Sequence, residues 1–313
     1  MVCNAIRKVC ASYKVLKIKK SEEVPLIVFK TTSSVHYCAR TFSLKENALS
    51  LFTLNGRIKC SYKIGAHQER YLAQGKAKEG ELIKKGNRWF FNLVLDIPEV
   101  MPIEEGIITA VDVGENNLAT TSHGTIYGGG KLRAKRDKFL ARRRKLQSNG
   151  SKSAKRRLKR ISGREKRHVK EVNHMISKKI VEEAVKMGTK TLVMEKLTHI
   201  RKRIKGGKRL RSRLHRWAWW EFQQFVEYKA QSKGISVVYV NPAYTSLTCS
   251  LCGSLGSRHK HQFKCSCCGS YQHSDRNACQ NLCRLARSAV LATAPVNRAD
   301  GSNGLPLVTS FSL

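Results

Sequence analysis

In the first third of the chain the hydrophobic residues fall into short runs that are separated by glycines. Val35 and Tyr37 have the two-residue spacing of one strand face, and residues 89–95 are apolar enough for a buried strand. Such short strands with glycine punctuation are typical of a small barrel or sandwich. We therefore predict a partial β-rich domain over residues 34–105, in which 98–105 is a linker, and assign no structure to residues 1–33.

The hydrophobic pattern changes in the second third of the chain. A continuous apolar run, 107–111, predicts a buried strand that ends at Asp112, and a second run, 191–194, ends at Glu195. Between these runs, apolar residues recur at helical spacing over 172–184. The other predicted elements are strands at 117–121, 125–127 and 235–240 and a helix that carries Trp217, Trp220, Phe222 and Phe225. This order predicts an α/β layer with a mixed sheet.

The charge of the chain indicates the kind of partner it has. The 313 residues are 41% hydrophobic, enough for one or two cores, and include 60 Lys and Arg against 22 Asp and Glu, a formal net charge of +38. Such an excess repels itself unless a polyanion neutralises it, and regularly spaced phosphates do so while releasing counterions. An anionic membrane surface is the alternative, but no apolar run of about 18 residues exists to span a bilayer. We expect nucleic acid as the partner and no membrane.

The basic residues concentrate in two tracts. Residues 131–170 contain 19 Lys and Arg, and residues 201–216 contain nine. Solvated helix faces are the simpler interpretation, but the self-repulsion of these tracts favours a phosphate-binding channel. The candidate contacts are Arg142, Arg143, Arg144, Arg156, Arg157, Arg201, Arg203, Lys205, Arg209 and Arg211. Residues 217–220 hold three tryptophans, most of which belong in a core at helical spacing, which leaves one ring to stack on a base.

Four cysteines near the C-terminus have the spacing of a structural metal site. Cys249, Cys252, Cys265 and Cys268 form the pattern C-x2-C-x12-C-x2-C, and a glycine follows the second cysteine of each pair. Tetrahedral zinc takes four such thiolates and leaves no open position. We predict one structural zinc that stabilises a small ribbon and has no catalytic role.

Other residues near the quartet keep alternatives open. Cys267 is a conceivable partner of Cys265, and His259, His261 or His273 could replace a thiolate. Buried free cysteines or redox chemistry would also explain part of the total of 11 cysteines. Residues 1–20 lack the apolar core of a signal peptide, so secretion is not expected, and we predict a cytoplasmic protein in which these cysteines bind metal.

Three acids form the candidate catalytic site. Acids at strand ends are commonly caps or solvated groups, but the strands before Asp112 and Glu195 are apolar on both faces and should be central neighbours in one sheet. Neighbouring strands lie about 4.8 Å apart, so both carboxylates should meet at one edge. Asp275 begins a predicted helix that could pack against it. Magnesium prefers such oxygen ligands, and two ions about 3.5–4 Å apart can promote phosphodiester hydrolysis.

These residues closely resemble the TnpB (OrfB) family of insertion sequences, which is considered ancestral to the type V CRISPR effector nucleases. The resemblance covers roughly residues 35–290. The matching segments are 111–114 (Val-Asp-Val-Gly), 117–120 (Asn-Leu-Ala-Thr), 193–197 (Val-Met-Glu-Lys-Leu), 245–246 (Thr-Ser), 249–253 (Cys-Ser-Leu-Cys-Gly), 263–269 (Phe-Lys-Cys-Ser-Cys-Cys-Gly) and 275–278 (Asp-Arg-Asn-Ala).

The resemblance implies a role for each of these groups. Asp112, Glu195 and Asp275 would bind the catalytic metals of a RuvC-type, RNase H-like nuclease. The cysteine segment would be a zinc finger that binds target nucleic acid, and the β-rich segment would be part of a wedge domain, an oligonucleotide-binding-like barrel. The implied domains are 34–105 (partial wedge), 106–248 (RuvC-like), 249–269 (zinc-ribbon insertion), 270–290 (last acid and helix) and 291–313 (a disordered tail).

Two functions compete at this point. The first is an RNA-guided DNA endonuclease with guide RNA and target double-stranded DNA as partners, magnesium as the catalytic cofactor and zinc as the structural one. The family normally has a further N-terminal strand and a helical recognition lobe, so the chain is expected to be an N-terminally shortened member. The second function is therefore a non-cleaving remnant or guide-dependent repressor. A plain zinc-ribbon transcription or ribosomal protein is a weaker third alternative, because it does not explain the acids at buried strand ends.

Overall fold

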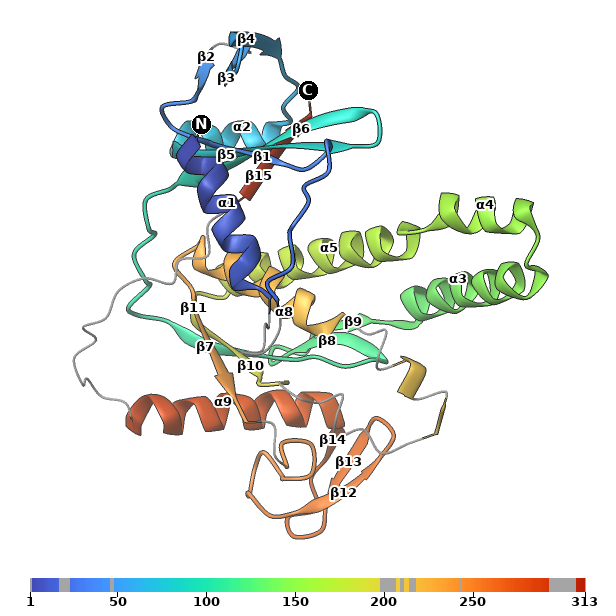
Figure 1. The fold of residues 1–313 in the computed structure, drawn as a ribbon. Coiled ribbons are helices and arrows are strands. Elements are labelled where there is room, and N and C mark those ends of the chain that lie inside the picture. Colours follow the sequence, from blue (N-terminus) through green and yellow to red (C-terminus); the bar gives the residue numbers. More distant parts are fainter. Residues whose placement is uncertain are drawn as a thin grey trace. The chain divides into compact units, whose positions relative to one another are not determined.

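The chain divides into two compact units. The computed structural model describes residues 2–16, 23–45, 48–197, 207–208, 211–213, 218–241, 244–292 and 308–312. Met1–Glu99 and Arg298–Leu313 make up the first unit, and Val100–Asn297 makes up the second (Figure 1). The division falls within the segment 98–105, which the sequence predicts as a linker.

The first unit is rich in β-structure, as predicted. One antiparallel sheet has the order β1-β5-β6-β15 and another has the order β2-β3-β4. The strands are β1 (Val35–Cys38), β2 (Phe42–Lys45), β3 (Ala48–Thr53), β4 (Gly56–Ser61), β5 (Lys76–Lys85), β6 (Arg88–Asp96) and β15 (Val308–Ser312), and the helices are α1 (Val2–Lys14) and α2 (Ala66–Gln74). These described strands form two separate sheets and not one closed barrel.

Strand β6 supplies the centre of this unit's core. Phe91, Leu93 and Leu95 are buried on one face, whereas Trp89 is 41% exposed, so the run that the sequence predicts as buried is half-buried. Alternate residues of a strand point to opposite faces, and here only one face is covered. Gly80 on β5 is needed for the packing, since a Cβ atom there would lie 2.2 Å from the Phe91 ring. The residue pattern therefore located the strand but overestimated its burial.

Two parts of the segment 291–313, which the sequence predicts as a disordered tail, have regular secondary structure. The last helix of the second unit runs to Ala292, and Val308–Ser312 forms β15, which pairs antiparallel with β6. Residues 293–307 lie outside the described residues. The edge of β6 offers unpaired backbone N–H and C=O groups, and a short segment gains hydrogen bonds by pairing there whatever its composition. Prediction from composition therefore failed for these five residues.

The second unit contains the predicted mixed sheet, in the order β11-β10-β7-β8-β9. Its strands are β7 (Ile107–Asp112), β8 (Asn117–Thr121), β9 (Ile126–Gly128), β10 (Thr189–Glu195) and β11 (Ser236–Val240). Strands β7, β10 and β11 are parallel, while β8 and β9 are antiparallel additions. Each strand is close to its predicted range, because apolar runs bounded by turn residues mark buried strands well.

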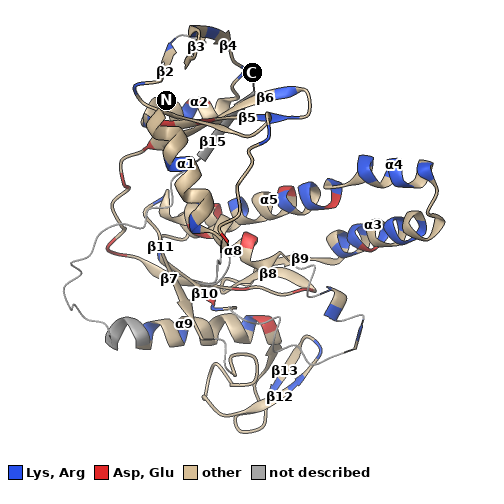
Figure 2. Cartoon of the chain, viewed as in Figure 1, with Lys and Arg blue, Asp and Glu red and all other residues tan. Residues whose placement is uncertain are grey.

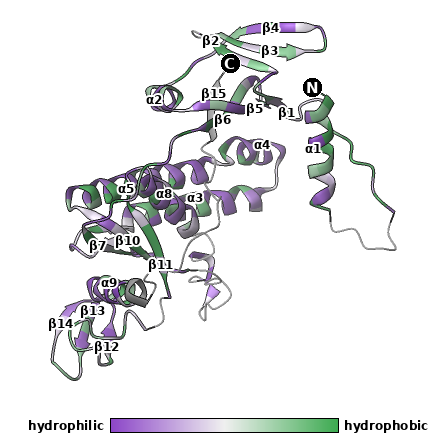
Figure 3. Ribbon diagram, turned by 90° about the vertical axis from the view of Figure 1, so that its left-hand side faces the viewer, coloured by the Kyte–Doolittle hydropathy of each residue, from purple (hydrophilic) through white to green (hydrophobic). Residues whose placement is uncertain are grey.

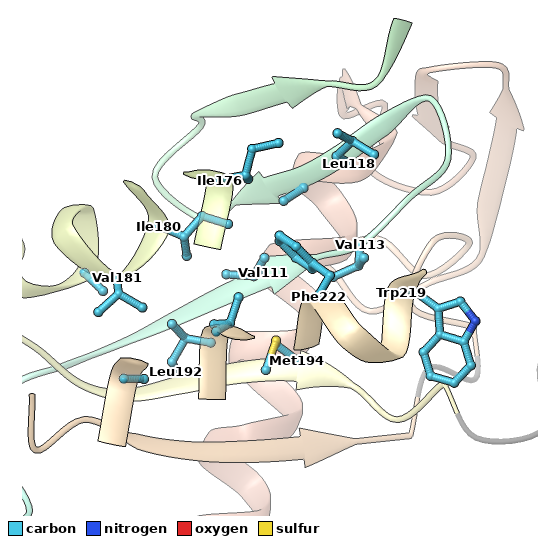
Figure 4. Close-up of a cluster of buried hydrophobic side chains, with 14 of the residues drawn as sticks. Val111, Val113, Leu118, Ile176, Ile180, Val181, Leu192, Met194, Trp219 and Phe222 are labelled. Carbon is cyan, nitrogen blue, oxygen red and sulfur yellow. The ribbon is translucent and has the colours of Figure 1, made fainter. Parts of the chain in front are cut away.

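Helices cover both faces of this sheet. α5 (Arg164–Lys186) and α8 (Trp219–Gln231) pack on one face, and α9 (Ser274–Ala292) packs on the other (Figure 1). Val111 faces the first pair of helices, as Figure 4 shows, and its neighbour Ala110 faces α9. A strand that is buried on both faces must be apolar throughout. This double burial explains the continuous hydrophobic run that ends at Asp112.

The first basic tract folds into helices. α3 (Gly130–Asn149) and α4 (Lys152–Ile161) lead into α5, and the ribbons of α3 and α4 carry many Lys and Arg residues and are largely hydrophilic (Figures 2 and 3). Gly150 has a φ of 64°, and Ser151 then caps α4 by accepting a hydrogen bond from the Ala154 amide. Both features end one helix and begin the next. Within the described residues, no helix combines the length and apolarity that crossing a membrane requires.

Three short antiparallel strands follow the sheet. They are β12 (Gly256–His259), β13 (Gln262–Cys265) and β14 (Tyr271–His273). We call residues 249–273 the cysteine ribbon. Its buried centre contains Phe263 together with Cys249 and Cys265, which is too few apolar side chains to hold a module without further cross-links. The strands reach four residues beyond the predicted end of the insertion, up to the start of α9.

Candidate functional site

The three predicted acids lie at one end of the central sheet. Asp112 is the last residue of β7, and Glu195 is the last residue of the neighbouring parallel strand β10. The preceding residues, Val111 and Met194, are register partners. Asp275 lies in the first turn of α9, which packs on this sheet. The sequence thus predicted correctly that Asp112 and Glu195 end adjacent strands.

The acids are close enough to affect one another's ionisation. Burial, together with the negative charges of Glu195 and Asp275, raises the pKa of Asp112 to about 8. Burial also raises the pKa of Glu195, with a further contribution from Asp275. Both causes disfavour the charged form, as expected when carboxylates share a site of low dielectric. The site therefore stores electrostatic repulsion that a cation would relieve.

Several polar side chains from other elements hold these carboxylates. Asn117 of β8 donates to Oδ2 of Asp275 over 2.8 Å, and the Arg258 guanidinium of β12 donates to Oδ1 over 3.2 Å. The Thr245 hydroxyl donates to Oε1 of Glu195 over 3.1 Å. Asp275 is only 7% exposed. These hydrogen bonds fix the orientation of two of the three acids.

Arg258 is a site residue that the sequence did not reveal. It binds Asp275, and its positive charge also lowers the pKa of Asp112 and of Glu195, which opposes the larger effect of burial. Nothing in the pattern around Arg258 distinguishes it from the other basic residues of the ribbon, because its role depends on how the ribbon folds onto the sheet. Asn117 and Thr245 belong to segments that carry the family resemblance, but nothing in the sequence assigns either residue a role.

The carboxylates do not converge to the spacing of a preformed metal cage. Among the described residues, His261, His273 and Asp275 bring ligand atoms within 4.8 Å of one another, and the three acids form no such group. The rings of His261 and His273 stack with centroids 5.4 Å apart. Enclosed like charges are expected to spread apart when only Arg258 offsets them. The oxygen donors and their raised pKa values nevertheless fit a divalent cation such as magnesium.

The cysteine quartet has the geometry that zinc requires. The four ligand atoms of Cys249, Cys252, Cys265 and Cys268 lie within 4.8 Å of one another. The distance between sulfurs is 3.7 Å for Cys249 and Cys268 and 3.5 Å for Cys252 and Cys265. A tetrahedron with zinc–sulfur bonds of about 2.3 Å has edges of about 3.8 Å, so the donor set fits one zinc ion.

The backbone around the quartet favours thiolate ligands, and the alternative ligands lie outside the group of four sulfurs. The amides of Cys267 and Cys268 both point at Sγ of Cys265 over 3.4 Å. Gly253 and Gly269 have φ values of 78° and 69°, which other residues rarely adopt. Cys267 is exposed and outside the group, and the two grouped histidines lie with Asp275 instead.

The described candidates for phosphate contact are all exposed. They are Arg142, Arg143 and Arg144 on α3, Arg156 and Arg157 on α4, and Arg211 (Figure 2). Arg143 also forms an ion pair with Glu165. The predicted contacts Arg201, Arg203, Lys205 and Arg209 lie outside the described residues, as does Trp217. Exposure leaves the described arginines available to a polyanion, so their role in binding stays a prediction.

The two described rings of the tryptophan cluster differ in burial, and the third tryptophan lies outside the described residues. Trp219 is 8% exposed and lies at the edge of the core cluster that includes Phe222 (Figure 4). Trp220, in contrast, is 63% exposed. Phe225 stacks on His174 with ring centroids 3.8 Å apart. One described ring of the cluster, Trp220, is thus free to meet a ligand.

The geometry defines an α/β protein with a mixed sheet, acids at the ends of two parallel strands and a cysteine ribbon next to the third acid. Two family models match this region, one described as "Probable transposase" (OrfB_IS605) over residues 98–201 and the other as "Cas12f1-like, TNB domain" over residues 219–282. The chain is 33% identical over 239 residues to the TnpB-like protein MJ0751 of Methanocaldococcus jannaschii, a match that covers 70% of this chain and 83% of that protein. The chain belongs to the TnpB/OrfB family.

Longer relatives match over part of their length. The chain is 32% identical over 219 residues to the CRISPR-associated endodeoxyribonuclease Cas12f1 of Sulfoacidibacillus thermotolerans, a match that covers 63% of this chain and 50% of that protein. The structure of CasPhi-2 (Cas12j) bound to crRNA superposes with a TM-score of 0.52 and 12% sequence identity, over 76% of this chain and 61% of that chain. The superposition supports the mixed α/β fold.

Proposed function

We propose that this protein is an RNA-guided DNA endonuclease that hydrolyses phosphodiesters of target DNA at Asp112, Glu195 and Asp275. The observation that carries the proposal is that three acids lie at one end of the sheet, where burial, together with the charges of Glu195 and Asp275, raises the pKa of Asp112 to about 8. A buried cluster of acids is costly for stability, and such clusters are found mainly where chemistry needs them. Family membership supports the same function, since Cas12f1 is named as an endodeoxyribonuclease and InsQ of Escherichia coli as a putative RNA-guided DNA endonuclease.

The residues of the site divide into ligands and orienting groups. Asp112, Glu195 and Asp275 would hold two magnesium ions, which supply activation of a water nucleophile and charge stabilisation when bound. Asn117 and Arg258 hold the two oxygens of Asp275, and Thr245 holds one oxygen of Glu195. These hydrogen bonds restrict the orientation of both carboxylates, as groups around metal ligands commonly do. Arg258 also provides a positive charge where a scissile phosphate would develop negative charge.

The rest of the chain would bind the nucleic acids. Pairing between guide RNA and target DNA supplies sequence choice in such enzymes, and the protein recognises duplex shape and a short flanking motif. The exposed arginines of α3 and α4 would neutralise phosphates. The cysteine ribbon, with one structural zinc, would contact the target strand, and the first unit would act as the wedge. The net charge of +38 supports a polyanionic partner.

The test is plasmid cleavage by the purified chain with its native transcript and magnesium. We expect Asp112→Ala to lower the cleavage rate by about 10³-fold or more, because a metal ligand contributes several kcal/mol to the transition state. The matched control is Glu171→Ala, since Glu171 is an acid on α5 whose side chain is 81% exposed and which is not one of the three acids. Equal cleavage by the Asp112→Ala variant and the unaltered chain would refute the assignment.

A second candidate is a non-cleaving, guide-dependent binder. The spread of the acids beyond 4.8 Å, with Arg258 bound to Asp275, is compatible with a site that no longer assembles. This alternative predicts tight target binding at low salt and no cleavage at any magnesium concentration. Cleavage that depends on Asp112 would exclude it.

A further inference from the structure

A pocket with no assigned role lies between the helices of the second unit. Its volume is about 840 Å³, and it is bounded by α3, α4, the first turns of α5 and the start of α8. Pockets of roughly 300–1,000 Å³ commonly take organic ligands. The described residues that line it include none of the three acids and none of the four cysteines. The pocket is therefore separate from both proposed metal sites.

One wall of the pocket is a single face of α3. Phe139, Arg143 and Gln147 succeed one another at four-residue spacing, which places them on the same side of the helix. Leu158 of α4 and Val169 of α5 add apolar surface opposite this face. The pocket thus combines hydrophobic walls with basic groups on the most polar helices of the chain.

Trp220 adds an aromatic ring that the fold does not bury. It lines the pocket and is 63% exposed, although the adjacent Trp219 is 8% exposed and packed in the core. Tryptophan contributes a large apolar surface, and one left in contact with water next to a pocket is typical of a binding site. A flat ligand with an aromatic face would cover it.

The charges of the pocket favour an anionic ligand. Arg136, Arg143, Lys159 and Lys166 line it, against two acids. Both acids already have partners: Glu165 pairs with Arg136 over 3.5 Å and with Arg143, while Glu221 accepts from Asn173 over 3.3 Å. Glu165 is mostly enclosed, with 14% of its side chain exposed, so the two arginines are held in place. The lysines remain to neutralise a phosphate.

We propose that this pocket binds an unpaired nucleotide of a nucleic-acid strand. Its base stacks on Trp220 and lies against Phe139 and Leu158, while its phosphate contacts Lys159 and Lys166. Stacking on an aromatic ring accepts any base, and the basic rim tracks the backbone, which is how strands are held without sequence preference. A hydrophobic peptide would fill the apolar walls equally well but would leave the positive charge without a counterion. The inference goes beyond the proposed cleavage site and does not require that the acids cut DNA.

The test compares strands with and without bases. Full-length protein in EDTA is titrated with labelled 12-nucleotide RNA, with DNA of the same sequence, and with an oligonucleotide of equal length made of abasic units. We expect Trp220→Ala to weaken binding of a base-containing strand about tenfold and to leave binding of the abasic strand unchanged. Trp220→Phe should retain most of the affinity, because a phenyl ring can still stack. A loss on RNA alone or on DNA alone identifies the strand that occupies the pocket.

Two controls make the outcome decisive. Met187→Ala removes an exposed hydrophobic side chain at the end of α5, outside the pocket, and should not reproduce the base-dependent loss. Replacing Lys159 and Lys166 with Gln should weaken all strands alike and reduce the slope of affinity against salt by about two. Equal losses for base-containing and abasic strands in Trp220→Ala, or no loss on any strand, would overturn the proposal. A fall in the thermal stability of Trp220→Ala without a change in binding would also overturn the proposal, because it would show that the chain itself covers the ring.

These experiments measure binding and no cleavage, so failure of this proposal is distinguishable from failure of the proposed endonuclease.

Discussion

The end of the sheet and the cysteine ribbon are two candidate metal sites that are built in opposite ways. The ribbon draws its four ligands from 20 consecutive positions, Cys249 to Cys268, and their sulfurs already lie at the distances of a zinc tetrahedron. The acid site draws Asp112, Glu195 and Asp275 from distant parts of the chain, and their oxygens do not converge to 4.8 Å. We expect the ribbon to depend on a metal for its folding, whereas the acids are positioned by the apolar core of the sheet.

The two sites also differ in how the protein shifts the pKa values of the candidate ligands. In the ribbon, a hydrogen bond from the Ser254 backbone lowers the pKa of the Cys252 thiol to about 6, which favours the thiolate that zinc needs. At the acids, burial and mutual repulsion raise the pKa of Asp112 to about 8. Against a lowering hydrogen bond from the Ser270 backbone, however, the neighbouring thiols raise the pKa of Cys268 to about 12. The ribbon thus combines one thiol that ionises readily with one that does not, whereas burial disfavours the charged form of both acids at the strand ends. The following predictions test this difference.

The largest effect is expected in the ribbon. Cys265→Ser should remove the bound zinc and unfold residues 249–273 locally, because structural zinc contributes roughly 10–16 kcal/mol in zinc-finger peptides. Zinc content by elemental analysis and hydrogen exchange of the ribbon measure this. Cys267→Ser is the matched control and should retain one zinc, since Cys267 is exposed and outside the quartet. Unaltered zinc content in Cys265→Ser would show that the quartet is not the ligand set.

The acid site should make stability depend on pH. Asp112 has a folded pKa of about 8 against an unfolded value of 3.8, so between these values the folded chain retains a proton that the unfolded chain has lost. Stability in EDTA should therefore fall as the pH rises from about 4 to 8, and magnesium should reverse the loss at the upper end. Denaturant unfolding at several pH values measures the slope. Asp112→Asn should flatten it, and a slope that is the same in both proteins would contradict the assigned pKa.

Arg258 connects the two regions, and its loss should affect the chemistry more than the fold. Arg258→Gln removes a charged hydrogen bond to Asp275 and should lower the cleavage rate about 10- to 100-fold, since such bonds contribute roughly 1.5–3 kcal/mol. Lys264→Gln removes an exposed cation from the same ribbon and serves as the control. Cleavage rates at saturating magnesium separate the two variants. Equal effects would indicate that only the net charge of the ribbon matters.

The smallest effect is expected from losing the hydrogen bond between Thr245 and the Glu195 carboxylate. Thr245→Val removes the hydroxyl that donates to Oε1 of Glu195, and we expect about a tenfold lower cleavage rate with little change in target binding. The magnesium concentration at half-maximal cleavage should rise, because Glu195 would ionise less readily. Ser246→Ala is the neighbouring control. A change in target affinity without a change in magnesium dependence would assign Thr245 to binding instead.

Local patterns in the sequence predicted the second unit more accurately than the first. The runs at 107–111 and 191–194 are strands, since burial on both faces leaves no ambiguity of register or face. The run at 89–95 is a strand too, but which of its faces is covered could not be known from its composition. Strand β15 was missed because its partner, the edge of β6, lies more than 200 positions earlier in the chain. Its pairing depends on a free edge and not on its own residues.

The sequence by itself determined which cysteines are the candidate ligands of the ribbon and which acids lie at strand ends. Cysteine spacing acts over a few residues, and continuous apolar runs place the acids that follow them at strand ends. The tertiary structure alone decided that Arg258 reaches Asp275, that Asn117 and Thr245 orient the carboxylates, and that Trp220 stays exposed beside a basic pocket. Those contacts join residues from different elements, and such contacts depend on how the elements pack, which no local spacing encodes.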